Sequence, residues 1–522
     1  MLNQMPIIMF KKLISMRNVV AIAICLAGIS MFSSCVKSSE KLILSFSITT
    51  PSAVGIIDEV AKTVTVTVPA GTDLTALIPT IVMSEQAMVS PESGVATNFT
   101  NPVQYTVTAE DGTTAVYTVT VIAGGVIPGA EPVELTSPIT ENTTLKDLGL
   151  PIDYFYTGTL SLKVQNNAIL TIEPGVCIQF RGEGGLAIED GSTIKAEGTA
   201  DKHIKFIGAT TDKGSWSEIV IYSVTANTMD YVEILNGGGE NLDRSAALYL
   251  DNGKLSLTNS LIDRSSRNGI TLEGSSGNQA AELVVFSNNT ISNCDKAPIF
   301  TYRYCGTYSL RNIANNNIYT NNTNEYIHIS TDLNTEIQAD MTIPHQNGYP
   351  WYLQEGLRIE YDRNVTIAQG AVILLGAGMR IYIDWDSHLI AEGTASKRIT
   401  IKGFKDNVGY WHEIQVHSQT PGTKFNYCDI SGGGGSATYK SLLYSYSGAW
   451  KDSYIALDNT TFSNSLHYGL FLEQYNTDSH CYVSSTTPSS VTFSQCPDGN
   501  IYGNSTGAYF VYDDLSSAGV LH

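Results

Sequence analysis

The chain has 522 residues and is strongly acidic, with 50 Asp and Glu against 30 Lys and Arg and a net charge of −20 at pH 7. Such a surface repels nucleic acid and anionic membranes, and it disfavours a polyanionic polysaccharide as ligand. Only 15 % of the residues are charged, while Gly (45) and Tyr (28) are abundant. This composition is typical of an all-β exported protein with many turns, unlike a helical cytosolic enzyme.

Residues 1–35 form a targeting segment. Basic residues precede an apolar run over 19–32 that is too short for a membrane span. The run ends in Ser33-Ser34-Cys35, which resembles a lipobox, and this resemblance implies that Cys35 is lipidated and becomes the mature N-terminus. An ordinary signal peptide cleaved nearby is the alternative. We expect an exported protein that is lipid-anchored in the cell envelope, with the outer membrane as its site, and that meets the membrane through this anchor only.

Residues 41–122 alternate apolar and polar side chains in short runs such as Thr63–Val68, a pattern that predicts half-buried antiparallel strands in a small β-sandwich. Glu110-Asp111-Gly112 supplies a hairpin signal. Together these runs resemble the Ig-like domain that follows the lipid anchor in Bacteroidetes surface lipoproteins. The resemblance implies a spacer between the anchor and the rest of the protein, with glycan binding as the alternative. Residues 123–138 are rich in Gly and Pro and predict a semi-stiff linker.

Residues 139–522 contain a duplication. The stretch 170–206 aligns without a gap with 365–401 at an offset of 195, so that Ala196–Ala200 matches Ala391–Ala395. Short strands recur every 8–12 residues or so, and Asn clusters mark the turns. We interpret the region as two related halves, 139–334 and 335–522, in which side-chain amides stack between successive coils.

The order of motifs in 139–522, from Leu170-Thr171-Ile172 through Ala-Glu-Gly-Thr and Trp-x-x-Ile to Gly-Gly-Gly, is similar to right-handed parallel β-helix (pectin-lyase-like) domains of bacterial surface proteins. The predicted fold is therefore all-β, with a small Ig-like β-sandwich followed by a right-handed parallel β-helix that carries an internal duplication. This resemblance implies little about chemistry, because the fold hosts lyases, hydrolases, adhesins and inert stalks.

The sequence contains partial matches to two kinds of enzyme. Glycoside hydrolases of this fold use clustered Asp residues, but Asn476-Thr477-Asp478 and Asp513-Asp514 lack the accompanying motifs and are interpreted as turns. Polysaccharide lyases need a basic residue, for which Arg264 and Arg267 are the candidates. The second copy keeps no fixed cation at either position. A polysaccharide lyase or glycoside hydrolase thus stays the alternative to a binding protein, and a structural adhesin or stalk is a third.

Aromatic residues provide the candidate ligand site. Trp216 and Trp411 occupy the same position in both copies, which indicates packing. The tripeptide Asp384-Trp385-Asp386 has an indole, that of Trp385, where the first copy has a plain turn. This difference suggests a sugar-stacking or Ca²⁺-assisted site. Trp351 and several tyrosines, Tyr444 and Tyr446 among them, add to this aromatic surface. The sequence therefore favours non-catalytic binding of a glycan or another surface ligand, such as a surface protein.

The cysteines indicate no metal site. Cys177 aligns with a valine of the second copy, which predicts a small buried residue. Cys294 with Cys305, and Cys481 with Cys496, are close enough in sequence to form disulfides in an oxidising compartment. No Cys-x-x-Cys occurs to suggest zinc. We predict no cofactor, and Ca²⁺ stays an alternative that no ligand spacing supports.

Overall fold

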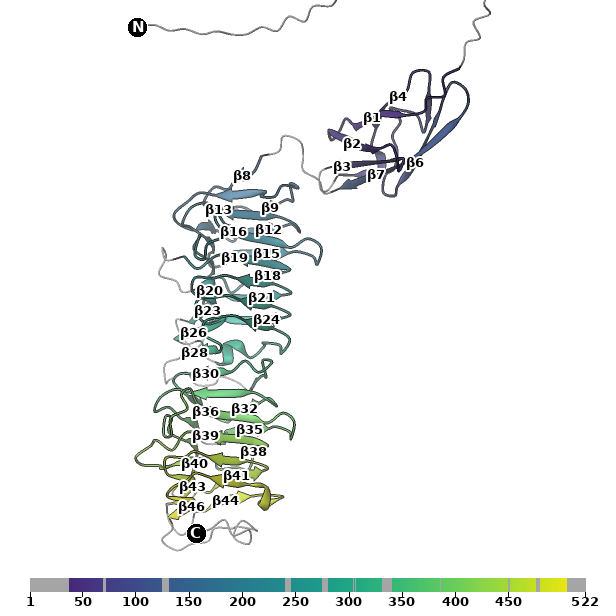
Figure 1. The fold of residues 1–522 in the computed structure, drawn as a ribbon. Helices are drawn as coiled ribbons and strands as arrows, with labels where there is room; N and C mark the ends of the chain where they lie inside the picture. Colours follow the sequence, from purple (N-terminus) through teal and green to yellow (C-terminus); the bar gives the residue numbers. More distant parts are fainter. Residues whose placement is uncertain are drawn as a thin grey trace, which may run out of the picture. The chain divides into compact units, whose positions relative to one another are not determined.

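The computed structural model describes residues 37–68, 72–123, 131–239, 246–274, 280–303, 305, 307–330, 340–384, 386–448, 451–475 and 479–504. Cys35, Trp385, Asn476-Thr477-Asp478 and Asp513-Asp514 fall outside these residues. The chain divides near Thr120 into two compact units (Figure 1). In the described parts, no helix has the length and apolar character needed to cross a membrane.

The N-terminal unit is a seven-stranded sheet of order β4-β1-β2-β3-β7-β6-β5. Its strands are β1 (Ile43–Ile48), β2 (Ala53–Asp58), β3 (Thr63–Val68), β4 (Pro79–Met83), β5 (Met88–Ser90), β6 (Val103–Thr108) and β7 (Thr114–Ala123), with a 3₁₀ turn η1 (Leu74–Ala76). Strand β1 pairs antiparallel with β4, and β6 pairs antiparallel with β5 and β7.

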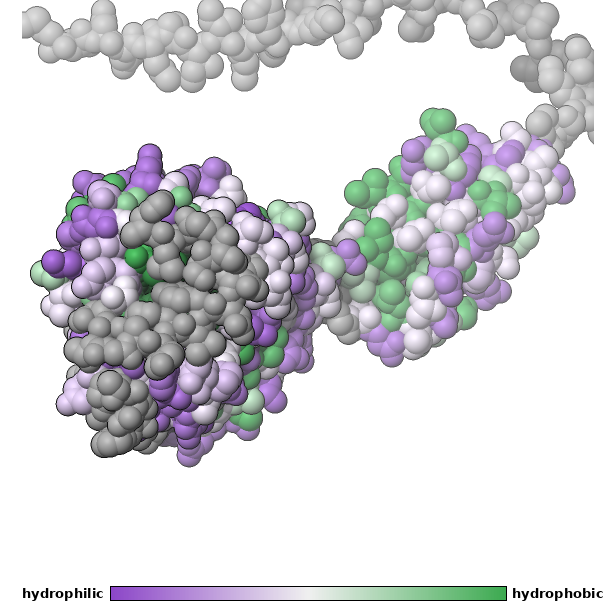
Figure 2. All heavy atoms as spheres, turned by 90° about the horizontal axis from the view of Figure 1, so that it is seen from below, coloured by the Kyte–Doolittle hydropathy of each residue, from purple (hydrophilic) through white to green (hydrophobic). Residues whose placement is uncertain are grey.

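One face of this sheet forms the core of the N-terminal unit. The rings of Phe46, Phe99 and Tyr105 pack there with centroids 5.6–6.4 Å apart. Alternation places Val54 and Ile56 of β2 outward, 75 % and 76 % exposed, and hydrophobic surface is visible on this unit in Figure 2. The predicted β-sandwich-like unit is confirmed.

The second unit is a parallel β-solenoid with three strands per coil (Figure 1). Its first half contains β8 (Val133–Glu134), β9 (Thr143–Leu145), β10 (Tyr154–Tyr156), β11 (Leu162–Val164), β12 (Ile169–Ile172), β13 (Cys177–Phe180), β14 (Leu186–Ile188), β15 (Thr193–Glu197), β16 (Ile204–Gly208), β17 (Ile219–Ile221), β18 (Asn227–Asp230), β19 (Val232–Leu235), β20 (Ala246–Asp251), β21 (Lys254–Thr258), β22 (Leu261–Asp263), β23 (Asn268–Gly274), β24 (Glu282–Ser287), β25 (Thr290–Ser292), β26 (Ile299–Arg303), η3 (Thr307–Leu310), β27 (Ile318–Thr320) and β28 (Ile327–Ile329).

The second half repeats the same order of strands. It contains β29 (Met341–Ile343), β30 (Trp351–Leu353), β31 (Leu357–Ile359), β32 (Asn364–Ile367), β33 (Val372–Leu375), β34 (Ile381–Ile383), β35 (His388–Glu392), β36 (Ile399–Gly403), β37 (Ile414–Val416), β38 (Lys424–Asn426), β39 (Cys428–Ser431), β40 (Ser441–Ser447), β41 (Ser453–Asp458), β42 (Thr461–Ser463), β43 (Tyr468–Gln474), β44 (Cys481–Ser484), η4 (Pro488–Ser490), β45 (Thr492–Ser494) and β46 (Gly499–Asn504). Strands β12 and β32, like β14 and β34, lie 195 residues apart, so the duplication seen in the sequence is a duplication of coils.

The solenoid core runs along its whole length. Leu170 and Ile172 point inward from β12 and stack on Ile194 and Ala196 of β15 in the parallel register. Inward side chains from Leu145 to Ile501 join in one buried cluster. Because burying one such aliphatic side chain stabilises by about 1.5–3 kcal/mol, stacked coils supply the stability that one coil lacks.

Asparagine side chains link successive coils at a turn, as predicted. The backbone N–H of Ser260 donates to the side-chain oxygen of Asn289 at 3.0 Å. The backbone N–H of Asn289 donates in turn to the side-chain oxygen of Asn317 at 3.0 Å. These amides satisfy backbone groups that the turn leaves unpaired.

The two halves join with a change of face that the repeat did not predict. Strand β28 is the third strand of its coil, yet it pairs with β30, the second strand of the next described coil. The 13-stranded sheet therefore continues from β11-β14-β17-β20-β23-β26 through β28 and β30 into β33-β36-β39-β42-β45. The sequence equivalents of β14–β26 form instead a separate sheet, β31-β34-β37-β40-β43-β46.

All six described cysteines are free thiols, so the disulfides considered for Cys294 with Cys305 and for Cys481 with Cys496 are not formed. Cys294 and Cys305 are core residues, and burial raises the pKa of each thiol to about 12. Cys177 is 5 % exposed, which confirms its interpretation as a small buried residue.

Candidate functional site

The outward side of the β31-β34-β37-β40-β43-β46 sheet carries a column of aromatic and amide side chains. The parallel register places Tyr382, Gln415, Tyr444, Phe471 and Tyr502 on successive strands in one line. Neighbouring strands lie about 4.8 Å apart, so rings on adjacent coils come into contact. We call this column, together with the outward residues two positions further along the strands, the ladder face. Those further residues are Glu360, Asp384, His417, Tyr446 and Glu473.

The rings of the ladder face contact one another along the sheet. The centroids of Tyr444 and Phe471 are 5.7 Å apart, and those of Phe471 and Tyr502 are 4.7 Å apart. Tyr446 stacks beside Tyr444 at 6.4 Å with an interplanar angle of 9°. Tyr444 is 2 % exposed, whereas Tyr502 is 39 % exposed. Ring surface is therefore accessible towards β46 and covered by other rings at β40.

Carboxylates hold the phenol groups of the ladder face in place. The hydroxyl of Tyr382 donates to Asp384 Oδ2 at 2.6 Å. The hydroxyl of Tyr444 donates to Glu473 Oε2 at 2.5 Å. Burial, followed by these hydrogen bonds to a carboxylate, raises the pKa of both tyrosines far above its usual range. Both phenols therefore stay protonated and keep their orientation at physiological pH.

The other polar groups of the face are also neutral or paired. Burial lowers the pKa of His417, partly opposed by Asp384, so the imidazole is uncharged at neutral pH. Arg358 donates to both oxygens of Glu360 at 2.5 and 2.7 Å. The face thus presents rings, amides and hydroxyls, a mixture suited to a ligand with apolar faces and many hydroxyl groups.

A second arginine beside the face is engaged in the same way. Arg380 Nε lies 3.5 Å from Oε1 of Glu413, and its NH1 group donates to Gln415 Oε1 at 3.0 Å. Its guanidinium also lies 5.7 Å from the centroid of Tyr439. Both arginines therefore have carboxylate partners, which leaves neither of them as a ready partner for a charged uronate.

The first half shows which of these residues the fold needs. At the positions of Tyr382, Gln415 and Phe471, the first half carries Ala187, Val220 and Thr271, as the equivalent register shows. Tyr444 alone has a tyrosine counterpart, Tyr249, whose hydroxyl also donates to a glutamate, Glu273. Tyr502 has an aromatic counterpart in Phe300. The Tyr–Glu pair is consequently part of the scaffold, whereas the rings of Tyr382 and Phe471 are not required by it.

Of the residues selected from the sequence, Asp384 lies on the ladder face, directly after β34. Asp386 is exposed near the same strand end. Trp351 is only 1 % exposed, points into the core from β30 and donates its indole N–H to the Pro344 carbonyl at 2.9 Å. This corrects the interpretation of Trp351 as a ligand residue, because the outward ring on that strand belongs to its neighbour Tyr352.

Arg264 and Arg267 do not reach the ladder face. They lie on the turn after β22 in the first half, where Arg264 adopts a left-handed backbone with φ of 60° and donates to the Thr211 carbonyl at 2.7 Å. Trp216 and Trp411 are buried. Each donates its indole N–H to a backbone carbonyl, of Leu235 at 2.8 Å and of Ser431 at 2.9 Å. This confirms their role in packing.

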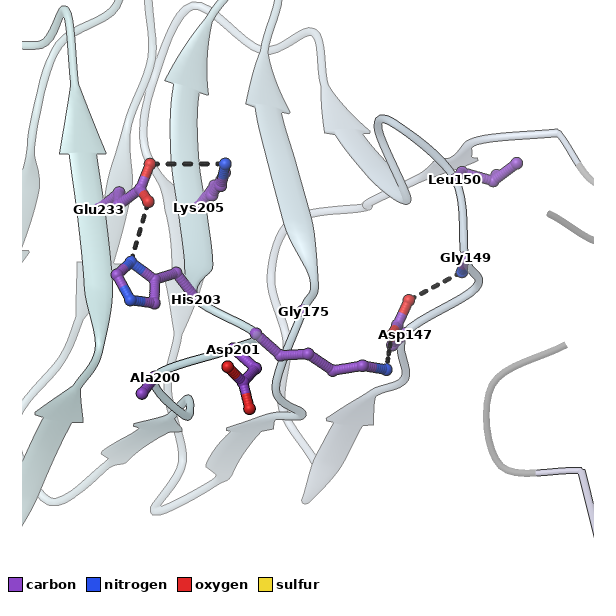
Figure 3. Close-up of a pocket in the computed structure, with 10 residues that line it drawn as sticks. Asp147, Gly149, Leu150, Gly175, Ala200, Asp201, His203, Lys205 and Glu233 are labelled. Carbon is purple, nitrogen blue, oxygen red and sulfur yellow. Dashed lines mark hydrogen bonds and ion pairs between the residues drawn. The ribbon is translucent and has the colours of Figure 1, made fainter. Parts of the chain in front are cut away.

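A polar cleft of about 490 Å³ lies at the start of the solenoid (Figure 3). Glu233 bonds His203 Nδ1 at 2.9 Å and lies 3.6 Å from Lys205 Nζ, and Lys202 pairs with Asp147 at 2.8 Å. The lining residues are Asp147, Gly149, Leu150, Gly175, Ala200, Asp201, Lys202, His203, Lys205 and Glu233.

The cleft is a weaker candidate than the ladder face. Its charged pairs neutralise one another, and its lining residues include no Phe, Tyr or Trp. The pair of His203 with Glu233 also recurs in the second half as Arg398 with Asp429, at 2.7 Å. A charge pair kept in both halves at the same coil corner indicates a structural role.

The fold and the ladder face define an all-β protein with a small antiparallel unit followed by a parallel β-solenoid. Residues 43–121 match the family model described as "SGBP, N-terminal", the N-terminal domain of the Bacteroidetes surface glycan-binding proteins. No curated protein matches the chain.

Two solved structures are similar over short stretches. A candidate glycoside hydrolase from Bacteroides thetaiotaomicron is 36 % identical over 17 % of this chain and 26 % of its own, with a TM-score of 0.16. A candidate secreted protein from Bacteroides fragilis is 21 % identical over 16 % of this chain and 95 % of its own, with a TM-score of 0.14. The chain thus spans about a quarter of the first protein.

Proposed function

We propose that this is an exported cell-envelope protein, held in the outer membrane by a lipid on Cys35, that binds an uncharged glycan on the ladder face without cleaving it. The observation that carries the proposal is the column of rings in register over successive coils of the second half, in which Tyr382 and Phe471 replace Ala187 and Thr271 of the first half. The match of residues 43–121 to the N-terminal domain of surface glycan-binding proteins supports it.

The chemistry of the face fits a sugar. The C–H face of a pyranose packs against an aromatic ring, while its hydroxyls exchange hydrogen bonds with phenols, amides and carboxylates. Phe471 and Tyr502 supply accessible rings, and the Glu473 carboxylate lies beside them on β43. Because the two arginines are paired with carboxylates, we expect an uncharged glycan and not a uronate.

Binding without cleavage is supported by how the carboxylates are used. Glycosidases need one carboxylic acid to protonate the leaving oxygen and a second to activate water or attack the sugar. On the ladder face, Glu360 accepts two hydrogen bonds from Arg358, and Glu473 accepts the phenol of Tyr444. Both carboxylates are therefore held in contacts within the protein, which weighs against their acting as the acid and base of a glycosidase.

The test uses the mature chain in affinity gels containing neutral polysaccharides, namely β-glucan, xylan, mannan and α-glucan. Tyr382→Ala and Phe471→Thr install the residues of the first half, which the same fold already accommodates. Each should weaken retention roughly tenfold, since an aromatic contact contributes about 0.5–1.5 kcal/mol beyond its buried area. Tyr482→Ala, which removes one ring of the stacked Tyr454–Tyr482 pair on another sheet, should bind normally.

Two results would contradict the proposal. If neither ladder variant differs from the unaltered chain in any gel, the face is not the binding surface. If the unaltered chain releases reducing or unsaturated sugars from the same polysaccharides, the protein is an enzyme. The anchor is tested separately by Cys35→Ala, which should release the protein from the membrane fraction.

A further inference from the structure

A second aromatic cluster lies on the outward side of the 13-stranded sheet, where the two halves of the solenoid meet. Phe300 of β26, His328 of β28 and Tyr352 of β30 occupy successive strands in register. Tyr326, just before β28, and Phe404, just after β36, extend the cluster sideways. We call these five residues the junction patch.

The rings of the junction patch form a continuous surface. Tyr352 and Phe404 are stacked at 4.3 Å with an interplanar angle of 27°. Tyr326 contacts Phe404 edge-on at 5.3 Å. His328 lies 4.9 Å from Phe300 and 5.0 Å from Tyr352. All five side chains are partly exposed, so the patch is neither part of the core nor fully open.

The patch contains polar atoms that the protein itself leaves unused. Among the described residues, the phenol hydroxyls of Tyr326 and Tyr352 have no hydrogen-bond partner, in contrast to those of Tyr382 and Tyr444. Burial raises the pKa of Tyr352 to about 12, so its hydroxyl remains a donor. The amide of Gln354, by contrast, is engaged: its Oε1 bonds His328 Nε2 at 2.7 Å and its Nε2 donates to Glu355 Oε1 at 2.7 Å, which holds the amide beside the rings. Rings with adjacent unpaired hydroxyls and an amide are the combination that a sugar uses.

The first half again shows what the scaffold requires. The position equivalent to Tyr352 is Phe155, since both pair in register with matching residues of the next coil. The face of Phe155 is covered by the guanidinium of Arg181 at 4.0 Å, and Ala209 stands where the second half has Phe404. In the first half, an arginine of the same chain therefore covers the ring of Phe155. At the junction, the rings and hydroxyls of the patch are partly exposed instead.

We propose that the junction patch is a second sugar-binding site for the same uncharged glycan, an inference that rests on the proposed function of the ladder face. Only Gln354-Glu355-Gly356 separate β30, which carries Tyr352, from β31, the first strand of the ladder sheet. The ladder sheet therefore begins on the same coil as Tyr352, and the nearest ring of the ladder face, Tyr382, lies one coil further on, on β34. A long glycan chain can occupy both, and the second contact then forms at a high effective concentration.

The experiment compares short and long forms of whichever polysaccharide the affinity gels retain. Titration calorimetry with its oligosaccharide should give two molecules per unaltered chain and one per chain for Tyr352→Ala or Phe404→Ala. Retention by the intact polymer should fall about 10²-fold, because two linked contacts become one. Tyr352→Phe keeps the ring stack and removes only the free hydroxyl, and it should weaken the second site without altering thermal unfolding. Tyr482→Ala serves again as the control.

The outcomes separate the two proposals. One oligosaccharide per unaltered chain, lost in Phe471→Thr and unchanged in both junction variants, overturns the second site and leaves the ladder face standing. Two per chain, with both retained in the junction variants, also overturns it. Absence of binding to every glycan by the unaltered chain overturns both proposals.

Discussion

Glu413, the residue before β37, allows a test of how a buried carboxyl under the ladder face changes the free energy of unfolding with pH. Its side chain is fully buried, and among the described residues neither carboxylate oxygen has a hydrogen-bond partner. Burial raises its pKa from 4.5 to about 7, and Arg380 only partly opposes this. We therefore expect Glu413→Gln, which keeps the shape and removes the charge, to change how stability depends on pH.

The direction follows from proton linkage. Between pH 4.5 and 7 the folded chain holds a proton on Glu413 that the unfolded chain has released, so raising the pH favours unfolding. A pKa raised from 4.5 to about 7 corresponds to a loss of about 3 kcal/mol in the free energy of unfolding, at about 1.4 kcal/mol per pH unit. This loss is complete above pH 7 and absent below pH 4.5.

Chemical denaturation followed by tryptophan fluorescence, at pH 4.5, 6 and 8, measures the effect. Relative to the unaltered chain, Glu413→Gln should gain about 3 kcal/mol between pH 4.5 and pH 8. Asp406→Asn is the control, because its carboxylate is 89 % exposed in its pair with Lys402. A difference between Glu413→Gln and the unaltered chain that is the same at all three pH values would refute the reasoning.

Three further predictions concern the scaffold and the ladder face. Cys177→Val installs the residue of the second half and should change the free energy of unfolding by less than about 1.5 kcal/mol, measured by denaturation. Gly185→Ala would place a Cβ 1.9 Å from the Glu218 carbonyl oxygen and should lower the free energy of unfolding by about 2 kcal/mol or more in the same assay. Glycan retention by Glu413→Gln should be constant between pH 6 and 8 in affinity gels. The substitution removes a buried carboxyl whose pKa is raised to about 7, and the lowered pKa of His417 and the raised pKa of Tyr382 and Tyr444 keep those groups uncharged. A step in this range would show that another charged group takes part.

The duplication made the coils predictable, because a repeat fixes which positions share a structural role. Cys177 could be assigned to the interior from its alignment with a valine, and the paired Trp216 and Trp411 from their occurrence in both copies. Such reasoning works where two diverged copies of a sequence form the same packed structure. It could not reach the junction, because β28 has two roles there. It pairs with β30 as β8 pairs with β10, and it also continues the third-strand sheet of the first half, so the sheets change face.

The error at Trp351 has a related cause. Side chains alternate sides along a strand, so a shift of one residue exchanges core and surface. The sequence Trp351-Tyr352 is compatible with either ring pointing outward. Only the pairing of β30 with β28 and β33 decides it, and that pairing joins residues more than twenty positions apart. The same applies to the ladder face, whose rings come from five separate coils and form no motif in the sequence.

The two copies also separate architecture from function more finely than either could alone. In each half, one tyrosine on the outer face of a sheet donates its hydroxyl to a glutamate, Tyr249 to Glu273 and Tyr444 to Glu473. Near this shared pair, the second half has Tyr382 and Phe471 where the first half has alanine and threonine. The first half shows that small residues at these positions are enough for the fold. Ordering an aromatic side chain costs conformational entropy. Packing in this fold does not require the rings of Tyr382 and Phe471, so we explain them by contact with a ligand. That asymmetry is why the ladder face, and not the self-neutralised cleft of the first half, carries the proposed binding site.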